Sequence, residues 1–358
     1  MVARRRTARR DAAVLVAASL LIVALGVGCG RGTEAADPKP AQSDAGAVVP
    51  YTVQTLELPY ASCGRPQRIG SAVYMTVSRG AGKGDSVIRY DLEARTTETL
   101  AEAPDPEIIG WFTVNQDWLV WSVGTELYAR SSQTGEEQVA STTRDLYAPA
   151  LNGDLLAWDD LTPERTHQIV IRDLATKETT AVAPLELPDL YNNFPTWNGD
   201  DLLWTDVTEN TGHYRVYNSL TGDISDYTLS DIRFRYPGYA LGLGERFYSI
   251  NFDRTDEWDW SLQQVGYYAV GERRFVPIVP DGFVANSLRV TNEFVAIVDE
   301  QMRLTLRPAD APEGDSTVYE PIESSIDFVE ASPDGTLIAT HESTDGTPRC
   351  TLYLIEPK

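Results

Sequence analysis

The sequence predicts an all-β protein, a β-propeller of seven four-stranded blades, with six blades as the alternative count. Three observations favour this fold. A short apolar run that contains tryptophan recurs as DWLVWSV (117–123), GDLLAWDD (153–160) and DDLLWTD (200–206). Polar turn residues in successive units are spaced by 40, 42 and 45 positions. The segments beside these turns alternate apolar and polar side chains with a period of two, as half-buried strands do.

Each unit contains a hairpin built around a polar turn. Four such hairpins cover residues 87–100, 126–140, 169–182 and 214–229, with turn residues Asp91, Ser131, Asp173 and Asn218. Two of the turns also contain a glycine, in TGE (134–136) and TGD (221–223), as tight hairpin connections prefer. Repeats of about 40–45 residues that each form a four-stranded antiparallel sheet are typical of propeller blades.

The tryptophan-bearing runs are interpreted as middle strands of their sheets. A middle strand of a blade lies between two neighbouring blades, so both of its faces are covered. We therefore expect Trp121, Trp158 and Trp204 to be buried as packing residues between sheets, and we do not expect them to stack on a ligand.

Three less regular units follow, at 230–279, 280–322 and 323–358. The last unit has three strands where a blade needs four, and we expect residues 51–58 to supply the fourth. Closing the ring in this way removes open sheet edges, which are an aggregation hazard. The closure would also bring Cys63 near Cys350. We expect a structural disulfide between them, with two unrelated buried thiols as the alternative.

The first 28 residues have the organisation of an export signal. Five arginines are followed by an apolar run of 16 residues, at 12–27, that ends just before Gly28-Cys29. A membrane-spanning helix needs about 20 residues; an N-terminal anchor helix is the alternative interpretation. Residues 25–29, LGVGC, resemble the lipobox of bacterial lipoproteins. This resemblance implies diacylation of Cys29 and an exported protein anchored on the extracytoplasmic side of a bacterial cell membrane.

The segment after Cys29 differs in composition from the rest of the chain. Residues 30–49, GRGTEAADPKPAQSDAGAVV, contain few large apolar side chains. Such a segment cannot bury enough surface to offset its ordering entropy. The expected organisation is therefore a signal peptide at 1–28, a lipidated flexible tether at 29–49 and a β-propeller domain at 50–358.

The chain is strongly acidic, with a formal net charge of −23. The leader at 1–28 has a net charge of +4, which leaves −27 for the remainder. Such a surface repels phosphate backbones and anionic lipid headgroups, so we expect neither nucleic-acid binding nor peripheral docking on lipid. We interpret the acidity as a solubility feature, and we expect a monomer that is attached to the membrane through its acyl anchor.

Three segments resemble a known family: ASPDGTLIA (331–339), PTWNGDDLLW (195–204) and IVIRDLATKETT (169–180). They are similar to the repeats of TolB-like propellers, which are related to WD-repeat proteins. The resemblance extends over most of residues 51–358 and implies a propeller fold. It implies little about activity, because propellers host many unrelated functions.

The sequence offers no catalytic signature. It contains no Gly-x-Ser-x-Gly nucleophile elbow, the motif of the hydrolase domain that accompanies some propellers. His167, His213 and His341 fall in separate units without the spacing of metal ligands. We therefore nominate no catalytic residue and no metal ligand.

Binding is expected on the face that carries the loops between second and third strands, because loops on a rigid scaffold concentrate binding residues. The connections that enter the innermost strands reach the same face. Among these loops, FDRTDEWDW (252–260) could hold a cationic or carbohydrate partner by stacking and cation–π attraction. Arg233 and Arg235 would serve either in internal ion pairs or in an anion site at the channel mouth. The binding candidates are Tyr147, Tyr191, Asn192, Asn193, Arg233, Arg235, Tyr236, Trp258 and Trp260.

Two functional hypotheses follow. The first is a lipid-anchored, non-catalytic scaffold without a cofactor, which binds an envelope or extracellular protein or a small ligand. The alternative is an enzyme of the lactonase or sugar-hydrolase type, in which Glu, Asp and Asn side chains would hold Ca²⁺ in the channel. Asn192 and Asn193 are the candidates for that role.

Overall fold

The computed structural model describes residues 50–142, 149–161, 167–185, 190–208, 211–229, 234–254, 258–319, 326–343 and 348–358. These residues form strands and turns and contain no helix. Within this part of the chain, no helical segment has the length and apolarity that a membrane crossing needs. The predicted cleavage site and the predicted lipidation site, Cys29, lie outside the described residues.

The strands form antiparallel sheets of consecutive chain segments. The first blade contains β2 (Cys63–Ile69), β3 (Ala72–Ser78), β4 (Asp85–Asp91) and β5 (Thr96–Glu102). The second contains β6 (Trp111–Val114), β7 (Trp118–Val123), β8 (Glu126–Ser131) and β9 (Glu137–Ser141). The third contains β10 (Ala150–Asn152), β11 (Leu155–Leu161), β12 (His167–Asp173) and β13 (Thr179–Leu185). The fourth contains β14 (Leu190–Asn198), β15 (Asp201–Thr208), β16 (Thr211–Asn218) and β17 (Ile224–Thr228).

The last three blades depart slightly from this regular pattern. The fifth has a split inner strand and contains β18 (Tyr236–Pro237), β19 (Leu241–Leu243), β20 (Arg246–Arg254), β21 (Trp258–Ala269) and β22 (Arg274–Pro277). The sixth contains β23 (Ala285–Val290), β24 (Phe294–Asp299), β25 (Leu304–Pro308) and β26 (Thr317–Tyr319). The seventh combines β27 (Phe328–Ala331), β28 (Leu337–Glu342) and β29 (Cys350–Pro357) with β1 (Tyr51–Leu58).

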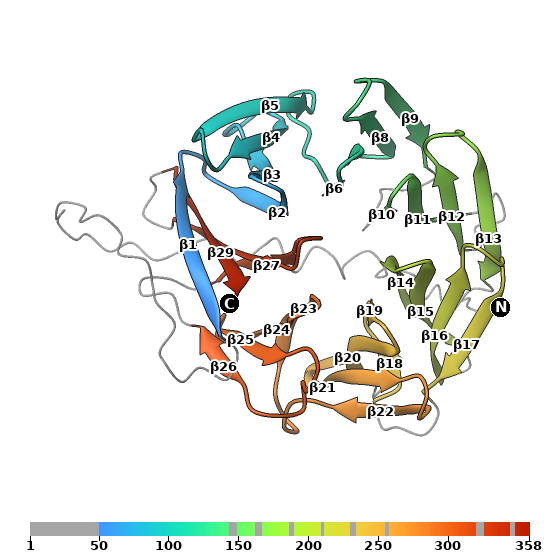
Figure 1. Cartoon of the computed structure of the whole chain (residues 1–358). Helices are drawn as coiled ribbons and strands as arrows, with labels where there is room; N and C mark the ends of the chain where they lie inside the picture. The colour runs from blue at the N-terminus through green and yellow to red at the C-terminus, as the bar shows by residue number, and fades with distance from the viewer. Residues whose placement is uncertain are drawn as a thin grey trace, which may run out of the picture. The chain divides into compact units, whose positions relative to one another are not determined.

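The inner strands connect the seven sheets into a closed ring. Each inner strand contacts the inner strand of the next blade, in the order β2, β6, β10, β14, β19, β23 and β27. The ring closes because β27 also contacts β2. Figure 1 shows the sheets in chain order, from blue β2 and teal β5 to red β27 and β29, with the fourth strands at the periphery. The seven-bladed propeller is therefore confirmed, and the alternative count of six is wrong.

The N-terminal strand closes the seventh blade as predicted. β1 pairs with β29 in a register that runs from Tyr51 opposite Pro357 to Leu58 opposite Cys350. Cys63 and Cys350 form a disulfide, with 6.0 Å between their Cα atoms and 287 residues between them in sequence. The alternative of two unrelated thiols is wrong, because the ring brings the two ends of the domain to one seam.

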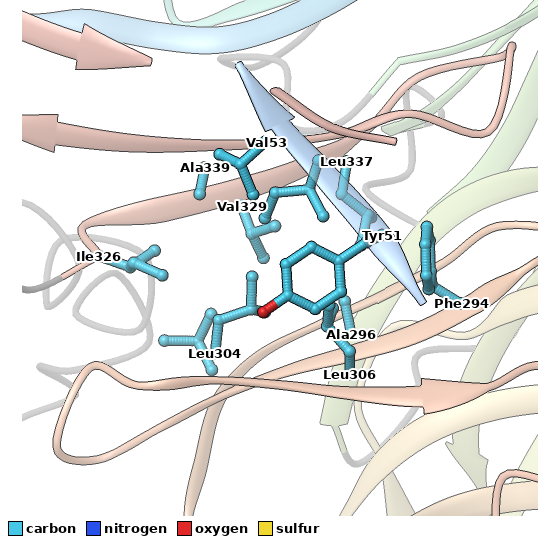
Figure 2. Packing of buried hydrophobic residues seen from close by; sticks show 12 residues of the cluster. Tyr51, Val53, Phe294, Ala296, Leu304, Leu306, Ile326, Val329, Leu337 and Ala339 are labelled. Carbon is cyan, nitrogen blue, oxygen red and sulfur yellow. The ribbon is translucent and has the colours of Figure 1, made fainter. Parts of the chain in front are cut away.

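The hydrophobic core is divided among the blade interfaces. Buried apolar residues of the described chain form seven clusters, one between each pair of neighbouring blades. Between the sixth and seventh blades, the Tyr51 ring of β1 lies among Leu304, Leu306 and Phe294, as Figure 2 shows. Burial of an aromatic ring of this size stabilises the interface by roughly 2 kcal/mol.

The tryptophans of the repeated motif occupy these interfaces. Trp121, Trp158 and Trp204 lie on the second strands of the second, third and fourth blades, with exposed fractions of 4%, 3% and 0%. Successive residues of a second strand point to opposite faces, so Leu202 and Leu203 enter different clusters. Because both faces are covered, these strands consist of nearly continuous apolar residues. The predicted packing role is confirmed.

The four turn residues identified from their spacing form the same local structure. The side-chain oxygen of each accepts hydrogen bonds from the backbone N–H groups two and three residues later, at 2.9–3.3 Å; the residues are Asp91, Ser131, Asp173 and Asn218. The residue four positions on has a left-handed backbone in every case. Gly135 and Gly222 fill it without strain, whereas Arg95 and Lys177 accept the less favourable conformation.

The amide residues of the first hairpins tie neighbouring blades together. The Nδ2 atoms of Asn115, Asn152 and Asn198 each donate to the carbonyl of a glycine in the next blade's hairpin, at 2.8, 2.9 and 2.8 Å. The acceptors are Gly153, Gly199 and Gly244. The recurring amide turn of the sequence therefore serves a contact between blades, in addition to turning the chain.

Candidate binding site at the inner strands

Six side chains from six different blades contact one another in sequence around the inner strands. We call this set the inner-strand cluster. Each member touches the next, in the order Phe194 (β14), Tyr239 (between β18 and β19), Arg289 (β23), Glu330 (β27), Arg65 (β2) and Trp111 (β6). The cluster therefore spans the fourth to seventh blades and continues across the seam to the first and second.

Arg289 is the fixed part of this cluster. Its Nε atom lies 2.8 Å from Oε2 of Glu330. Its Nη1 donates to the Tyr239 hydroxyl at 2.5 Å and to the Leu288 carbonyl at 2.8 Å. The Tyr239 hydroxyl donates in turn to the Leu288 carbonyl at 3.0 Å. The side chains of Arg289 and Glu330 are only 20% and 14% exposed, so this arrangement is both satisfied and shielded.

Arg65 has a much looser set of contacts. Its Nη1 lies 3.8 Å from Oε1 of Glu330, and its Cζ lies 3.1 Å from the centroid of the Trp111 ring. Its guanidinium donates no hydrogen bond to any residue in the described part of the chain, although the side chain is only 30% exposed. A guanidinium carries five N–H donors, so the described residues leave the hydrogen-bonding capacity of Arg65 available to a ligand.

A local irregularity of β2 places Arg65. The register of β2 against β3 shifts between Gly64 and Gln67, which marks a bulge. A Cβ at Gly64 would lie 2.6 Å from Oγ1 of Thr76, so glycine lets the two strands approach. Arg65 follows with a φ of 49° and precedes Pro66, although residues before proline favour extended backbone. The left-handed backbone costs about 1–2 kcal/mol.

The cluster carries one more positive than negative charge. Burial lowers the pKa of Arg65 to about 10, against the attraction of Glu330 and with added repulsion from Arg289. Burial opposes ionisation of Glu330 as well, but the charge and hydrogen bond of Arg289 lower its pKa below the usual value. Burial likewise acts to lower the pKa of Arg289, and the charge of Glu330 outweighs it and raises that pKa. The group thus presents cationic N–H donors beside aromatic rings, which is an arrangement suited to recognition.

Several of the candidates from sequence cannot be placed. Cys29, Tyr147 and Arg233 lie outside the described residues. Tyr191, Asn192 and Asn193 belong to β14, and Trp258 and Trp260 belong to β21, but only the backbones of these five are described. The predicted loop at 252–260 is shorter than expected, because β20 extends to Arg254 and pairs there with Trp258.

The two remaining candidates do not belong to the inner-strand cluster. Tyr236 is 7% exposed and therefore packs inside the protein. Arg235 is exposed, and it forms no ion pair with the described residues. Neither residue contacts Arg65, Arg289 or Glu330 in the described structure.

Sequence reasoning missed the inner-strand cluster. Arg65, Arg289 and Glu330 stand in three different units, 41 or more positions apart, and none belongs to a motif. The available signal was weak: the Gly64-Arg65-Pro66 sequence is unusual at the start of an inner strand. Only ring closure shows that the three charges meet.

The histidines occupy separate blades, as the sequence indicated. Nδ1 of His167, His213 and His341 lies 3.2, 2.9 and 3.4 Å from a carboxylate oxygen of Asp159, Asp226 and Asp327 respectively. Among the described residues, no group of three or more His, Cys, Asp or Glu side chains has the geometry to hold a metal ion.

Comparison with known proteins identifies the architecture. No family model matches the chain, and no curated protein matches it in sequence. A chain from the mitotic checkpoint complex is similar in structure at a TM-score of 0.59 and 10% identity, over 94% of this chain and 98% of that one. The Pan2 WD40 domain of Neurospora crassa gives 0.55 and 10%, over 83% and 89%.

A structure of prolyl endopeptidases is also similar, at a TM-score of 0.59 and 13% identity, over 82% of this chain. The match covers 45% of that longer chain. Identities this low establish fold alone, and the TolB-like resemblance stays a prediction. The chain is thus a β-propeller whose architecture is similar to that of WD40 and other propeller proteins.

Proposed function

We propose that this chain is an exported binding scaffold, held on the extracytoplasmic side of a bacterial membrane by a lipid on Cys29. The disulfide between Cys63 and Cys350 supports export, because such bonds persist in oxidising compartments and are rare in the cytosol. The leader at 1–28 would direct the chain to export, and the lipobox-like residues 25–29 would place the lipid on Cys29.

The inner-strand cluster is the observation that carries the binding role. It joins the inner strands of six blades, and the guanidinium of Arg65 donates no hydrogen bond to the residues that the structure describes. A ring closed by seven packed interfaces holds such groups in fixed positions, which reduces the entropy lost on binding. The partner is an envelope or extracellular protein, or a small ligand, that approaches the face on which chain segments enter the inner strands.

The enzyme alternative receives less support from the same residues. The inner-strand cluster, with two arginines and one glutamate, carries a net positive charge, which repels a divalent cation. Asn192 and Asn193 stay candidates for a Ca²⁺ site on β14. Protein that retains about one equivalent of Ca²⁺ after exhaustive dialysis, measured by mass spectrometry of the element, would favour the enzyme over the scaffold.

Replacing Cys29 by alanine is expected to release the protein from the membrane fraction of a bacterial host. The wild-type chain should sediment with membranes and carry the mass of a diacylated cysteine at its N-terminus, because the acyl chains provide the attachment. Ser43→Ala in the tether is the matched control and should stay membrane-bound. Retention of unprocessed Cys29→Ala in the membrane would instead support the anchor-helix interpretation.

Site-specific photo-crosslinking is expected to find the partner on one face only. Ile108, 60% exposed, lies in the connection that enters β6, and Leu220, 77% exposed, lies in the turn between β16 and β17. Antiparallel order places these two connections on opposite faces of the ring. A photoreactive residue at position 108 should give a discrete adduct in intact cells, and one at position 220 should give none. Equal adducts from both positions would contradict a face-specific scaffold.

A further inference from the structure

We propose that Arg65 binds the carboxylate of a small molecule at the inner edge of the ring, with the positive charge of Arg289 adding to the attraction. This inference deepens the proposed function, since it rests on the binding role of the inner-strand cluster. It names the chemistry of the ligand and the residue that makes the principal contact.

The distribution of hydrogen bonds points to Arg65 as the open member of the pair. Arg289 is occupied by Glu330, Tyr239 and the Leu288 carbonyl. Arg65 meets Glu330 only at 3.8 Å and makes no hydrogen bond with the described residues. The Arg65 side chain is 30% exposed, so its N–H donors are within reach of solvent and of a ligand that enters from it. A ligand oxygen would supply the missing acceptor.

The backbone holds Arg65 in place for this purpose. Its left-handed φ of 49° at the bulge of β2 is unfavourable for arginine. Such outliers persist only where the surroundings impose them, and they concentrate at ligand sites. Contact with the Trp111 ring orients the guanidinium from one side, which leaves N–H donors at its edge for an oxyanion.

Charge balance selects a single carboxylate. Two arginines and Glu330 sum to one positive charge, and a bound monoanion brings the cluster to neutrality. It would also relieve the repulsion that Arg289 exerts on Arg65, which contributes to the lowered pKa of Arg65. A phosphate dianion would overshoot this balance beside Glu330, in a chain that already carries −23. Carboxylates accept two parallel N–H bonds from arginine, so a monocarboxylate suits both charge and geometry.

Titration of the purified full chain in detergent with acetate tests the proposal. Sodium chloride and phosphate at equal ionic strength are the comparison ligands, and isothermal calorimetry with the melting temperature is the readout. Acetate should bind saturably with one site per chain, more tightly than phosphate. A response equal to that of chloride, or tighter binding of phosphate, would overturn the assignment of a carboxylate site.

Two variants with one control locate the site. Arg65→Gln should weaken acetate binding by about tenfold or more, since a hydrogen bond to a charged group contributes about 1.5–3 kcal/mol. Arg273→Gln removes an exposed arginine from the turn between β21 and β22 and should bind as the wild type does. Should Arg65→Gln fail to fold, Glu330→Gln serves instead: removal of the competing carboxylate should strengthen acetate binding severalfold.

The proposal and the proposed function fail separately. Unchanged acetate binding in Arg65→Gln, or weaker binding in Glu330→Gln, would rule out this carboxylate site. A face-specific adduct from position 108 would then still support the scaffold. Conversely, specific acetate binding without a crosslinked adduct from position 108 would support the carboxylate site and contradict a protein partner.

Discussion

Replacing both Cys63 and Cys350 by alanine is expected to lower the free energy of unfolding by about 5 kcal/mol. The disulfide closes a loop of 287 residues, and restriction of the unfolded chain grows with the logarithm of loop length. Both cysteines are fully buried in the cluster between the seventh and first blades, so part of the loss also comes from packing. Urea denaturation monitored by tryptophan fluorescence measures the change.

Reduction provides the control for the disulfide. Wild-type protein unfolded and refolded with a reductant should lose a similar amount of stability, whereas the double-alanine variant should not respond to the reductant. Equal urea midpoints for the variant and the oxidised wild type would show that seam packing alone holds the ring closed.

Replacing Glu330 by glutamine is expected to lower the free energy of unfolding by about 3 kcal/mol at pH 7. Breaking a shielded ion pair from one side leaves uncompensated charge, with losses of about 3–5 kcal/mol. Glu330 forms ion pairs with both Arg65 and Arg289. Glu356→Gln is the matched control, because Glu356 pairs with Arg68 but is 37% exposed. Exposed pairs contribute about 0–1 kcal/mol, and a loss equal to that of Glu330→Gln would contradict the special role of the inner-strand cluster.

The Glu330 contribution should depend on pH in a defined direction. Arg289 and Arg65 lower the pKa of the folded carboxylate against the effect of burial, so the folded state favours the ionised form. The stability difference between the wild type and Glu330→Gln should therefore be fully present above the unfolded pKa of about 4.3. It should shrink as the pH falls through the folded pKa. A difference that stays constant down to pH 2 would exclude an ionic origin.

Much of the fold was predictable because its determinants are local and repeated. Asp91, Ser131, Asp173 and Asn218 each direct a turn through their own side chain, and their spacing therefore reveals the blade period. The fourth strand of the last blade and the bond between Cys63 and Cys350 followed from the need to close the ring. These inferences require only the alternation of side chains and the count of strands in each unit.

The inner-strand cluster could not be predicted in the same way. Arg65, Arg289 and Glu330 each stand alone in their own repeat, and the attraction among them exists only after seven blades have formed. Sequence reasoning instead selected Arg233 and Arg235, because they are positively charged residues in a strongly acidic chain. One of them, Arg235, is exposed and away from the cluster, which shows that charge contrast along a chain does not indicate position in a ring.

The pairing of β1 with β29 determines how the domain would respond to mechanical pulling. A force applied through the residues before Pro50 acts first on β1, whose eight residues pair with β29 from Tyr51 to Leu58. If β1 detached, Cys63 would remain bonded to Cys350 on β29. The disulfide would then bear the force, and the chain could not extend beyond Cys63. The domain could therefore lose β1 under load while the ring of blades stays closed through the disulfide.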